Sequence, residues 1–134
     1  MKQALLPAGW TPPRGYANGV AASGVQVFIA GQIGWDAQNR FHTDAFAEQA
    51  VQALQNVVAV LHEAGGKPEH LVRMTWYVTD KREYLASLKD IGRAFRELIG
   101  DYDIAMSAVQ VVALIEDRAK VEIEATAVFP HEAQ

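Results

Sequence analysis

The chain contains no cysteine among its 134 residues. This absence excludes thiolate catalysis, iron–sulfur clusters, cysteine-based zinc sites and disulfide bridges, and it favours a reducing cytoplasm as the location. Histidine is also scarce, since the four histidines are scattered along the chain and form no His-x-x-x-His pair. We therefore expect no bound metal.

An excess of positive charge and long apolar runs are absent as well. The formal net charge is −4 and the sequence pI is near 5.5, which disfavours binding to nucleic-acid backbones because such binding depends on clustered Lys and Arg. The apolar part of residues 1–7 is too short for a signal peptide, and no apolar run approaches the roughly 20 residues of a membrane span. We expect a soluble cytoplasmic protein with neither a nucleic-acid nor a membrane partner.

The length is that of a single domain, which we place over residues 1–134. A chain of this size can bury roughly two thirds of the surface that its unfolded form exposes. Three of the five prolines lie in residues 7–14, so we expect residues 1–14 to form an extended, irregular arm. Residues 16–22 and 25–30 then predict a hairpin whose turn is Ser23-Gly24.

Two later segments have helical periodicity, with a strand between them. The first helix is expected to follow a cap at Thr43 or Asp44 and to end at Gly65-Gly66. The second is expected to begin at the capping-box arrangement Asp80-x-x-Glu83 and to continue to Gly100. The apolar positions that define the two helices are Phe46, Ala50, Leu54, Val57, Val58 and Leu61, and Tyr84, Leu88, Ile91, Phe95 and Leu98. Residues 72–79 alternate and predict a strand that points Val72, Met74, Trp76 and Val78 inward.

Residues 104–114 and 119–128 predict an antiparallel strand pair joined by the polar turn 115–118. In the second strand, apolar Val121 and Ile123 alternate with charged residues, which is typical of a half-buried strand. In the first strand, apolar residues occupy both faces, as in a strand that is covered on both sides.

These elements predict an α+β fold in the order β-β-α-β-α-β-β, in which each of the two helices has one apolar face. If both helices lie on the same face of the sheet, the opposite face needs another cover. The apolar residues on both faces of the 104–112 strand suggest that this cover is another copy of the chain. The pattern therefore predicts an oligomer.

The order of elements and four local strings resemble the RidA family of imine and enamine deaminases, also called the YjgF or UK114 family. The strings are Tyr16-Ala-Asn-Gly-Val20, Ile29-Ala-Gly-Gln-Ile33, Asn56-Val57 and Val121-Glu-Ile-Glu-Ala-Thr-Ala-Val128. The resemblance runs over nearly the whole chain and implies a chorismate-mutase-like fold, with a mixed sheet and two helices on one of its faces. It also implies a homotrimer whose sheets form a barrel, with three clefts at the subunit interfaces. Family members hydrolyse reactive 2-imino acids or their enamine tautomers to 2-keto acids and ammonia, so the resemblance implies a small-molecule ligand and no cofactor.

The resemblance also implies roles for individual residues. Tyr16 matches a tyrosine that borders the cleft, Gly31 lies where a backbone group contacts the ligand, and Glu122 matches a glutamate associated with the catalytic water. In the active deaminases, a string like Ala-Arg-Ser supplies an arginine that holds the substrate carboxylate. Met106 stands in that place in this chain. Since a thioether has neither charge nor donor, we expect little activity on simple 2-imino acids.

Each candidate residue also has a purely structural interpretation. Met106 either packs in the core or an interface, or forms a cleft wall that selects an uncharged or aromatic ligand. Arg14, which comes where the family usually reads Gly-Pro-Tyr, either faces solvent or supplies the missing positive charge. Trp35 either stacks on a ligand or caps the barrel. Tyr16 is either a structural residue or part of the cleft. Glu122 is either a solvated residue on the polar face of its strand or part of the cleft.

Two functions of different class follow. The first is a cofactor-independent hydrolase or deaminase that acts on C=N bonds. The rival is a non-catalytic trimer that senses a metabolite or binds a partner protein through the same cleft. A ribonuclease and a chorismate mutase fit poorly, because the chain is acidic and has no catalytic histidine pair and no cluster of arginines.

Overall fold

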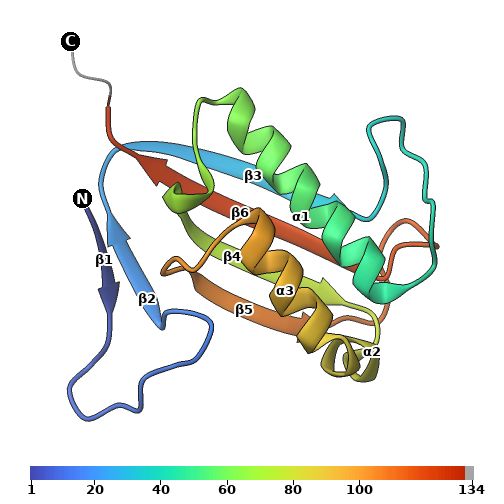
Figure 1. The fold of residues 1–134 in the computed structure, drawn as a ribbon, viewed down its shortest axis with the longest axis horizontal. Coiled ribbons are helices and arrows are strands. Elements are labelled where there is room, and N and C mark those ends of the chain that lie inside the picture. The colour runs from blue at the N-terminus through green and yellow to red at the C-terminus, as the bar shows by residue number, and fades with distance from the viewer. Residues whose placement is uncertain (132–134) are drawn as a thin grey trace.

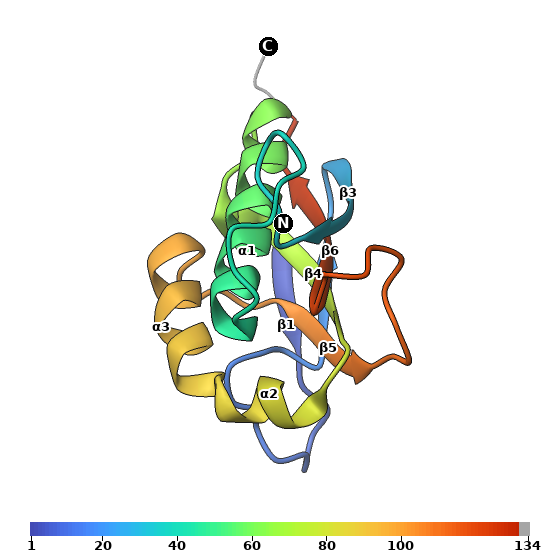
Figure 2. The same cartoon turned by 90° about the vertical axis from the view of Figure 1, so that its right-hand side faces the viewer.

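The computed structural model describes residues 1–131 and has two layers, with helices packed on one face of a mixed β-sheet (Figures 1 and 2). The predicted α+β class is confirmed. The elements in chain order are β1 (Lys2–Leu5), β2 (Gly19–Ala22), β3 (Val25–Ile33), α1 (Phe46–Glu63), the short 3-10 helix η1 (Pro68–His70), β4 (Leu71–Val78), α2 (Lys81–Ala86), α3 (Leu88–Leu98), β5 (Ala105–Gln110) and β6 (Val121–Phe129).

The main sheet has four strands in the order β3-β6-β4-β5. β4 runs parallel to β5 and antiparallel to β6, and β3 runs antiparallel to β6. The prediction that residues 104–114 pair directly with residues 119–128 is therefore wrong, since β4 lies between β5 and β6. A parallel pair needs a crossover of about a dozen residues or more. The α2–α3 segment provides this crossover, so β5 takes one edge of β4 and leaves the other edge to β6.

β2 pairs with β1 and not with β3, so the predicted hairpin between residues 16–22 and 25–30 is wrong. Gly24 lies between β2 and β3 and has a φ of +142°. A side chain at this position would collide with the backbone of Phe129 at the end of β6. Glycine therefore lets the chain pass from the small sheet into the main sheet in close contact with β6.

The N-terminal segment, expected to be an irregular arm over residues 1–14, contains a strand, β1. Lys2 attaches β1 to the start of β4, because its Nζ donates hydrogen bonds to the carbonyl groups of Glu69 and Leu71, both at 3.0 Å. Further along, Ala17 forms a parallel bridge to Ala105, and its N–H donates to the carbonyl of the preceding residue, Ile104, at 2.9 Å. This bridge places residues 14–16 beside the edge strand β5.

The apolar face predicted for the first helix is confirmed in α1. Phe46, Ala50, Leu54, Val57 and Leu61 are buried, and Val58 packs against them while partly buried. The predicted cap is wrong, since the N-cap is Ala45 with no side-chain hydrogen bond, one residue beyond the Thr43 and Asp44 candidates. The Thr43 hydroxyl instead accepts the N–H of Ala45 at 3.0 Å. Gly65 follows the helix with a φ of +82°, as its sequence position predicted.

The second predicted helix is divided into α2 and α3 at Ser87. The predicted cap is confirmed, because the Asp80 carboxylate accepts the N–H groups of Arg82 at 2.8 Å and Glu83 at 3.4 Å. Serine competes for backbone hydrogen bonds and favours helix ends over helix interiors, which suits the break at position 87. Within residues 1–131, no helix combines the length and the apolar character needed to cross a bilayer.

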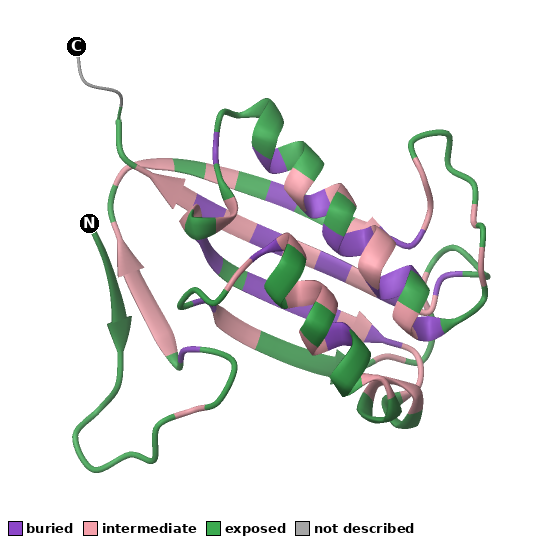
Figure 3. Ribbon diagram, viewed as in Figure 1, coloured by how far each residue is buried: buried purple, intermediate pink, exposed green. Residues whose placement is uncertain are grey.

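Buried residues alternate with partly exposed ones along β6 (Figure 3), so the two faces of the main sheet differ in burial. On the helix-covered face, Met74 and Ile123 are fully buried in a core shared with α1 and α3, whereas Phe28 on the other face is 73% exposed. Residues 107–110 of β5 are also exposed. The prediction that this strand is covered on both faces is therefore not met within one chain.

Candidate functional site

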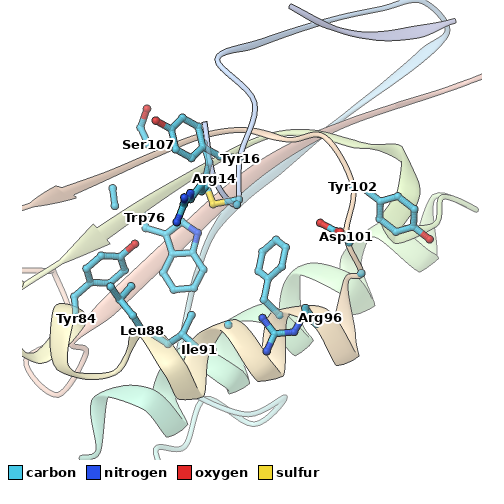
Figure 4. A pocket seen from close by; sticks show the side chains of 16 residues that line it. Arg14, Tyr16, Trp76, Tyr84, Leu88, Ile91, Arg96, Asp101, Tyr102 and Ser107 are labelled. Carbon is cyan, nitrogen blue, oxygen red and sulfur yellow. The ribbon is translucent and has the colours of Figure 1, made fainter. Parts of the chain in front are cut away.

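A cavity of about 590 Å³ lies between α3, β5, the α2 residue Tyr84 and residues 14–16 (Figure 4). Its volume lies within the range typical of sites for small organic ligands. Three of the residues expected at a ligand site line this cavity, namely Arg14, Tyr16 and Met106. The bridge between Ala17 and Ala105 explains why they meet, because it holds the segment before β2 against the start of β5.

Met106 lies on the helix-covered face of the sheet. It pairs in register with buried Met74, and Trp76 on the same face pairs with Ala108. Met106 is partly buried, packs against the hydrophobic core and also lines the cavity. The packing and cleft-wall interpretations of Met106 are therefore compatible with each other.

Trp76 is a cavity residue that the alternating pattern identified only as core. Its side chain is 2% exposed, and among residues 1–131 its indole Nε1 is buried without a hydrogen-bond partner. The indole contacts the ring of Tyr84, with 6.2 Å between ring centroids. Tryptophan N–H groups usually find a partner when buried, so an unpaired one beside a cavity is a signal that sequence reasoning could not provide.

The α3 wall of the cavity contains a gap at Gly92. Apart from the backbone of the helix itself, a Cβ at this position would come within 4 Å of one atom of residues 1–131, Nη1 of Arg96, at 3.4 Å. Arg96 therefore lies folded back along α3 towards Gly92, at the cavity wall. The phenol of Tyr84 stands nearby on the same side of the sheet, and partial burial raises its pKa above the usual value.

The charged groups of the cavity are Arg14, Arg96 and Asp101. Neither arginine forms an ion pair with a partner in residues 1–131, whereas Arg93 on the same helix lies 3.8 Å from Asp90. Two guanidinium groups and one carboxylate leave a net positive charge at the rim. The cavity can therefore accept an anion even though Met106 carries no charge.

Gly31 and Glu122, the other two residues that match the family pattern, lie together on the opposite face of the sheet. Glu122 pairs in register with Tyr77 of β4, whereas Met106 pairs with Met74. Since successive residues of a strand point to opposite faces, positions 74 and 77 face opposite ways. A Cβ on Gly31 would lie 2.5 Å from Oε2 of Glu122, so glycine leaves the space that the carboxylate fills.

The neighbouring acid on this face, Glu124, is already engaged. It accepts a hydrogen bond from the Tyr77 hydroxyl at 2.7 Å, and this bond raises the pKa of Tyr77. Glu122 has no hydrogen-bond partner within the described residues and is only partly exposed. Of the two carboxylates, Glu122 is the one whose oxygen atoms remain available to water or a ligand.

Trp35 lies neither at the cavity nor beside Glu122 and Gly31. It lies in the loop after β3, where its ring centroid is 5.7 Å from that of Phe41. Asn56 of α1 holds this loop, since its Nδ2 donates to the carbonyls of Ile33 at 3.1 Å and Trp35 at 2.8 Å. The same loop contains a contact of 2.6 Å between Asp36 and His42, and the hydrogen bond from His42 is the main cause of the lowered pKa of Asp36.

The chain was compared with known proteins. Residues 9–129 match the family model described as Endoribonuclease L-PSP. A RutC family protein of Aquifex aeolicus is 33% identical over 129 residues, which cover 96% of this chain and 99% of that protein. The 2-iminobutanoate/2-iminopropanoate deaminase of Salmonella typhimurium is 34% identical over 113 residues, 84% of this chain and 86% of that enzyme.

A solved structure of similar fold is that of YyfB, a protein of the conserved Rid family from Yersinia pestis. It superposes with a TM-score of 0.84 and 31% sequence identity, covering 96% of this chain and 98% of that one. The agreement extends over the whole fold, which is therefore the chorismate-mutase-like fold that the four sequence strings implied. On this evidence of sequence and structure, the chain belongs to the RidA (YjgF/UK114) family.

Proposed function

We propose that the chain is a trimeric hydrolase of C=N bonds whose sites form where two subunits meet. The observation that carries this proposal is the division of the family's site residues between two surfaces. Met106 and Tyr16 lie at the helix-side cavity, and Glu122 and Gly31 lie on the open face of the sheet. A site that needs both groups is completed when the cavity side of one copy meets the open face of the next.

The arrangement of the two half-sites also supports a closed ring. A contact between two different surfaces of identical chains is head-to-tail, and it closes into a ring when the rotation allows. The open face offers apolar surface for this contact, including Phe28 at 73% exposure and Val109 at 44%. Burying such side chains stabilises association by about 25 cal/mol per Å² of apolar surface.

The proposed reaction adds water to the imine carbon. Glu122 accepts a proton from the attacking water, whose oxygen bonds to carbon while the C=N electron pair moves to nitrogen. The proton then passes to nitrogen and gives the carbinolamine R₂C(OH)NH₂. The hydroxyl proton next moves to the same nitrogen, the C–N bond breaks with its electron pair going to nitrogen, and ammonia leaves as the C=O bond forms. The overall change is R₂C=NH plus H₂O to R₂C=O plus NH₃, with no redox step. The free oxygen atoms of Glu122 suit this role better than those of Glu124, which accepts from Tyr77.

Met106 limits the substrates that this reaction reaches. An uncharged side chain offers no bidentate contact to a carboxylate at that position. We expect slow turnover of iminopropionate for this reason, although a relative is named as the deaminase of that class of compound. The preferred substrate is a reactive imine or enamine that is held by other contacts of the cavity.

Mixed trimers test the shared site. Glu122→Gln removes the proton acceptor from the open face, and Ala108→Phe fills the cavity beside Trp76 on the other side. Each variant alone is expected to release ammonia slowly from freshly generated imines. When the two are unfolded and refolded together, random assortment restores about one quarter of the sites. Mixed trimers that stay as inactive as the parents contradict the shared site, provided that size measurements show that they assemble.

Met106 also favours a second candidate, a non-catalytic trimer that binds a metabolite or a partner protein through the same cleft. Such a protein has no turnover to lose. Glu122→Ala separates the candidates, because a hydrolase loses ammonia release while it keeps its fold. If wild type and variant release ammonia equally slowly from every imine offered, the binding role stands and the hydrolase does not.

A further inference from the structure

The cavity beside Met106 is unusually aromatic. The chain has three Trp, four Tyr and five Phe residues in total. Five of them line this one cavity, namely Tyr16, Trp76, Tyr84, Phe95 and Tyr102. Aromatic rings bind other rings through offset and edge-to-face contacts, each of which adds to the burial of apolar surface. The walls therefore suit a planar or bulky apolar group.

Arg96 gives the same cavity a cationic group that does not depend on position 106. Arg96 is an exposed residue that lines the cavity, and its Nη1 lies 3.4 Å from the point where a side chain at Gly92 would begin. Arg14 lines the rim from the segment before β2. Neither has an ion-pair partner within residues 1–131, and a guanidinium binds a carboxylate through two parallel hydrogen bonds.

The indole of Trp76 gives a second, independent sign of a ligand. Its Nε1–H is buried, lies on a residue that lines the cavity and has no acceptor in the part of the chain that the structure describes. A buried donor without a partner costs free energy. An oxygen atom brought into the cavity by a ligand can supply the acceptor.

We infer that the cavity binds an aromatic carboxylic acid, with Arg96 as the carboxylate anchor in place of the arginine that Met106 replaces. The ring packs among Trp76, Tyr84 and Phe95, and Arg14 adds charge at the rim. Combined with the proposed function, on which this extension rests, the substrate class is the aromatic 2-imino acids. Arg96 is thus a specificity-determining residue on an element that the family pattern does not mark.

Binding of 3-phenylpropionate, which is unreactive, tests the inference without any turnover. Titration calorimetry of the wild-type protein is expected to give a Kd on the order of 1 mM or tighter. Propionate lacks the ring and 3-phenylpropan-1-ol lacks the charge, so each is expected to bind at least about tenfold more weakly. Equal binding of propionate and 3-phenylpropionate overturns the aromatic assignment.

Two variants on α3 separate the anchor from general charge. Arg96→Gln is expected to weaken 3-phenylpropionate binding by about tenfold or more. Arg93→Gln removes the same charge from the same helix, but Arg93 is 61% exposed, pairs with Asp90 and does not line the cavity, so its Kd stays at the wild-type value. Wild-type affinity in Arg96→Gln, or equal losses in both variants, overturns the role of Arg96.

Trp76 reports on the position of the ligand. In a proton–nitrogen correlation spectrum, the Nε1–H signal of Trp76 is expected to shift on addition of 3-phenylpropionate, while that of Trp35 stays. Binding without a shift at Trp76 places the acid elsewhere and overturns the inference. A failure of the hydrolase proposal is distinguishable, since Glu122→Gln then has no effect on imine hydrolysis while the acid still binds and still requires Arg96.

Discussion

Met106 and Glu122 point to opposite faces of one sheet, with β4 between the strands that carry them. No rotamer of either side chain brings the two groups together within one subunit, because the backbone direction at each position is set by the register with β4. Their cooperation in one reaction therefore requires a second copy of the chain. Under the proposed function, the assembly of subunits is therefore part of the chemistry.

Glu122→Gln is expected to lower turnover by about 10²- to 10⁴-fold, which is the usual contribution of a positioned proton acceptor. The matched control is Glu124→Gln, on the same face and strand, whose carboxylate accepts from Tyr77. The control is expected to keep activity within a few-fold. Ammonia release and circular dichroism check both. A larger loss of turnover in Glu124→Gln than in Glu122→Gln would mean that Glu124, and not Glu122, is the proton acceptor.

Met106→Arg is expected to increase kcat/KM for iminopropionate by about tenfold or more, since a charged carboxylate contact contributes about 1.5–3 kcal/mol. Met106 lines the cavity as well as packing on the core, so the long arginine stem can stay packed while its head reaches the ligand. Met106→Leu controls for the change of shape. An unchanged kcat/KM in a folded Met106→Arg protein would show that position 106 does not face the substrate.

Gly31→Ala is expected to reduce turnover as strongly as the loss of Glu122. The new Cβ would lie 2.5 Å from Oε2 of that residue, so the carboxylate must move. Gly19→Ala is the control, since its nearest neighbour is the flexible end of Leu5 at 3.3 Å. Initial rates of ammonia release compare the two variants. Full activity in Gly31→Ala would mean that the present position of the Glu122 carboxylate is not the catalytic one.

The segments that sequence reasoning predicted well are those whose evidence is local. Helical spacing located α1, and strict alternation located β4 and β6, because these patterns report which face of one element is buried. Strand pairing was predicted wrongly at two places. The alternation of Val121 and Ile123 is the same whichever strand lies alongside, so it could not show that β4 separates β5 from β6.

Contacts between residues distant in sequence were also beyond prediction at the candidate site. Met106, Tyr16 and Arg14 could be predicted from short strings because they lie close to recognisable motifs. Trp76 was assigned to the core by its inward position, and this was correct but incomplete, since the partner of its N–H depends on residues distant in sequence. Arg96 belongs to no sequence motif, and it is an exposed residue in the structure. Its place at the cavity depends on Gly92, which leaves the wall open one turn away.

Gly92→Ala is expected to stabilise the fold by about 0.5–1 kcal/mol, because glycine in a helix interior costs this much relative to alanine. Among the described residues, and apart from the backbone of α3, the added Cβ would meet within 4 Å the Arg96 guanidinium, at 3.4 Å, which is the end of a flexible side chain. Urea unfolding measures the change. Gly100→Ala is the opposite control, since Gly100 has a φ of +109° and alanine there is strained. A destabilised Gly92→Ala protein would mean that α3 packs more tightly at this point.

Acidification is expected to lower the free energy of unfolding, because Asp36 loses its contacts in the loop that carries Trp35. The pKa of Asp36 is lowered from 3.8, first by the hydrogen bond from His42 and then by that from the Arg40 N–H. A lowered pKa in the folded state adds stability that is present above the unfolded value and is lost as the pH falls through the folded one. Asp36→Asn removes this dependence, so its unfolding free energy changes less than that of wild type between pH 5 and about pH 3. If the unfolding free energies of wild type and Asp36→Asn depend on pH in the same way, Asp36 does not contribute this stability.

The position of β6 between β3 and β4 has a consequence for how the protein is made. The ribosome releases β3 and β4 well before β6, yet the two strands are not paired with each other in the finished sheet, and both pair with β6. The nascent chain therefore has unpaired strand edges until β6 emerges, when its long-range pairings with β3 and with β4 can form together. Translation must pass β6 before the sheet can close, so a ribosome that stalls before residue 121 leaves a chain without one of the two interior strands of the sheet.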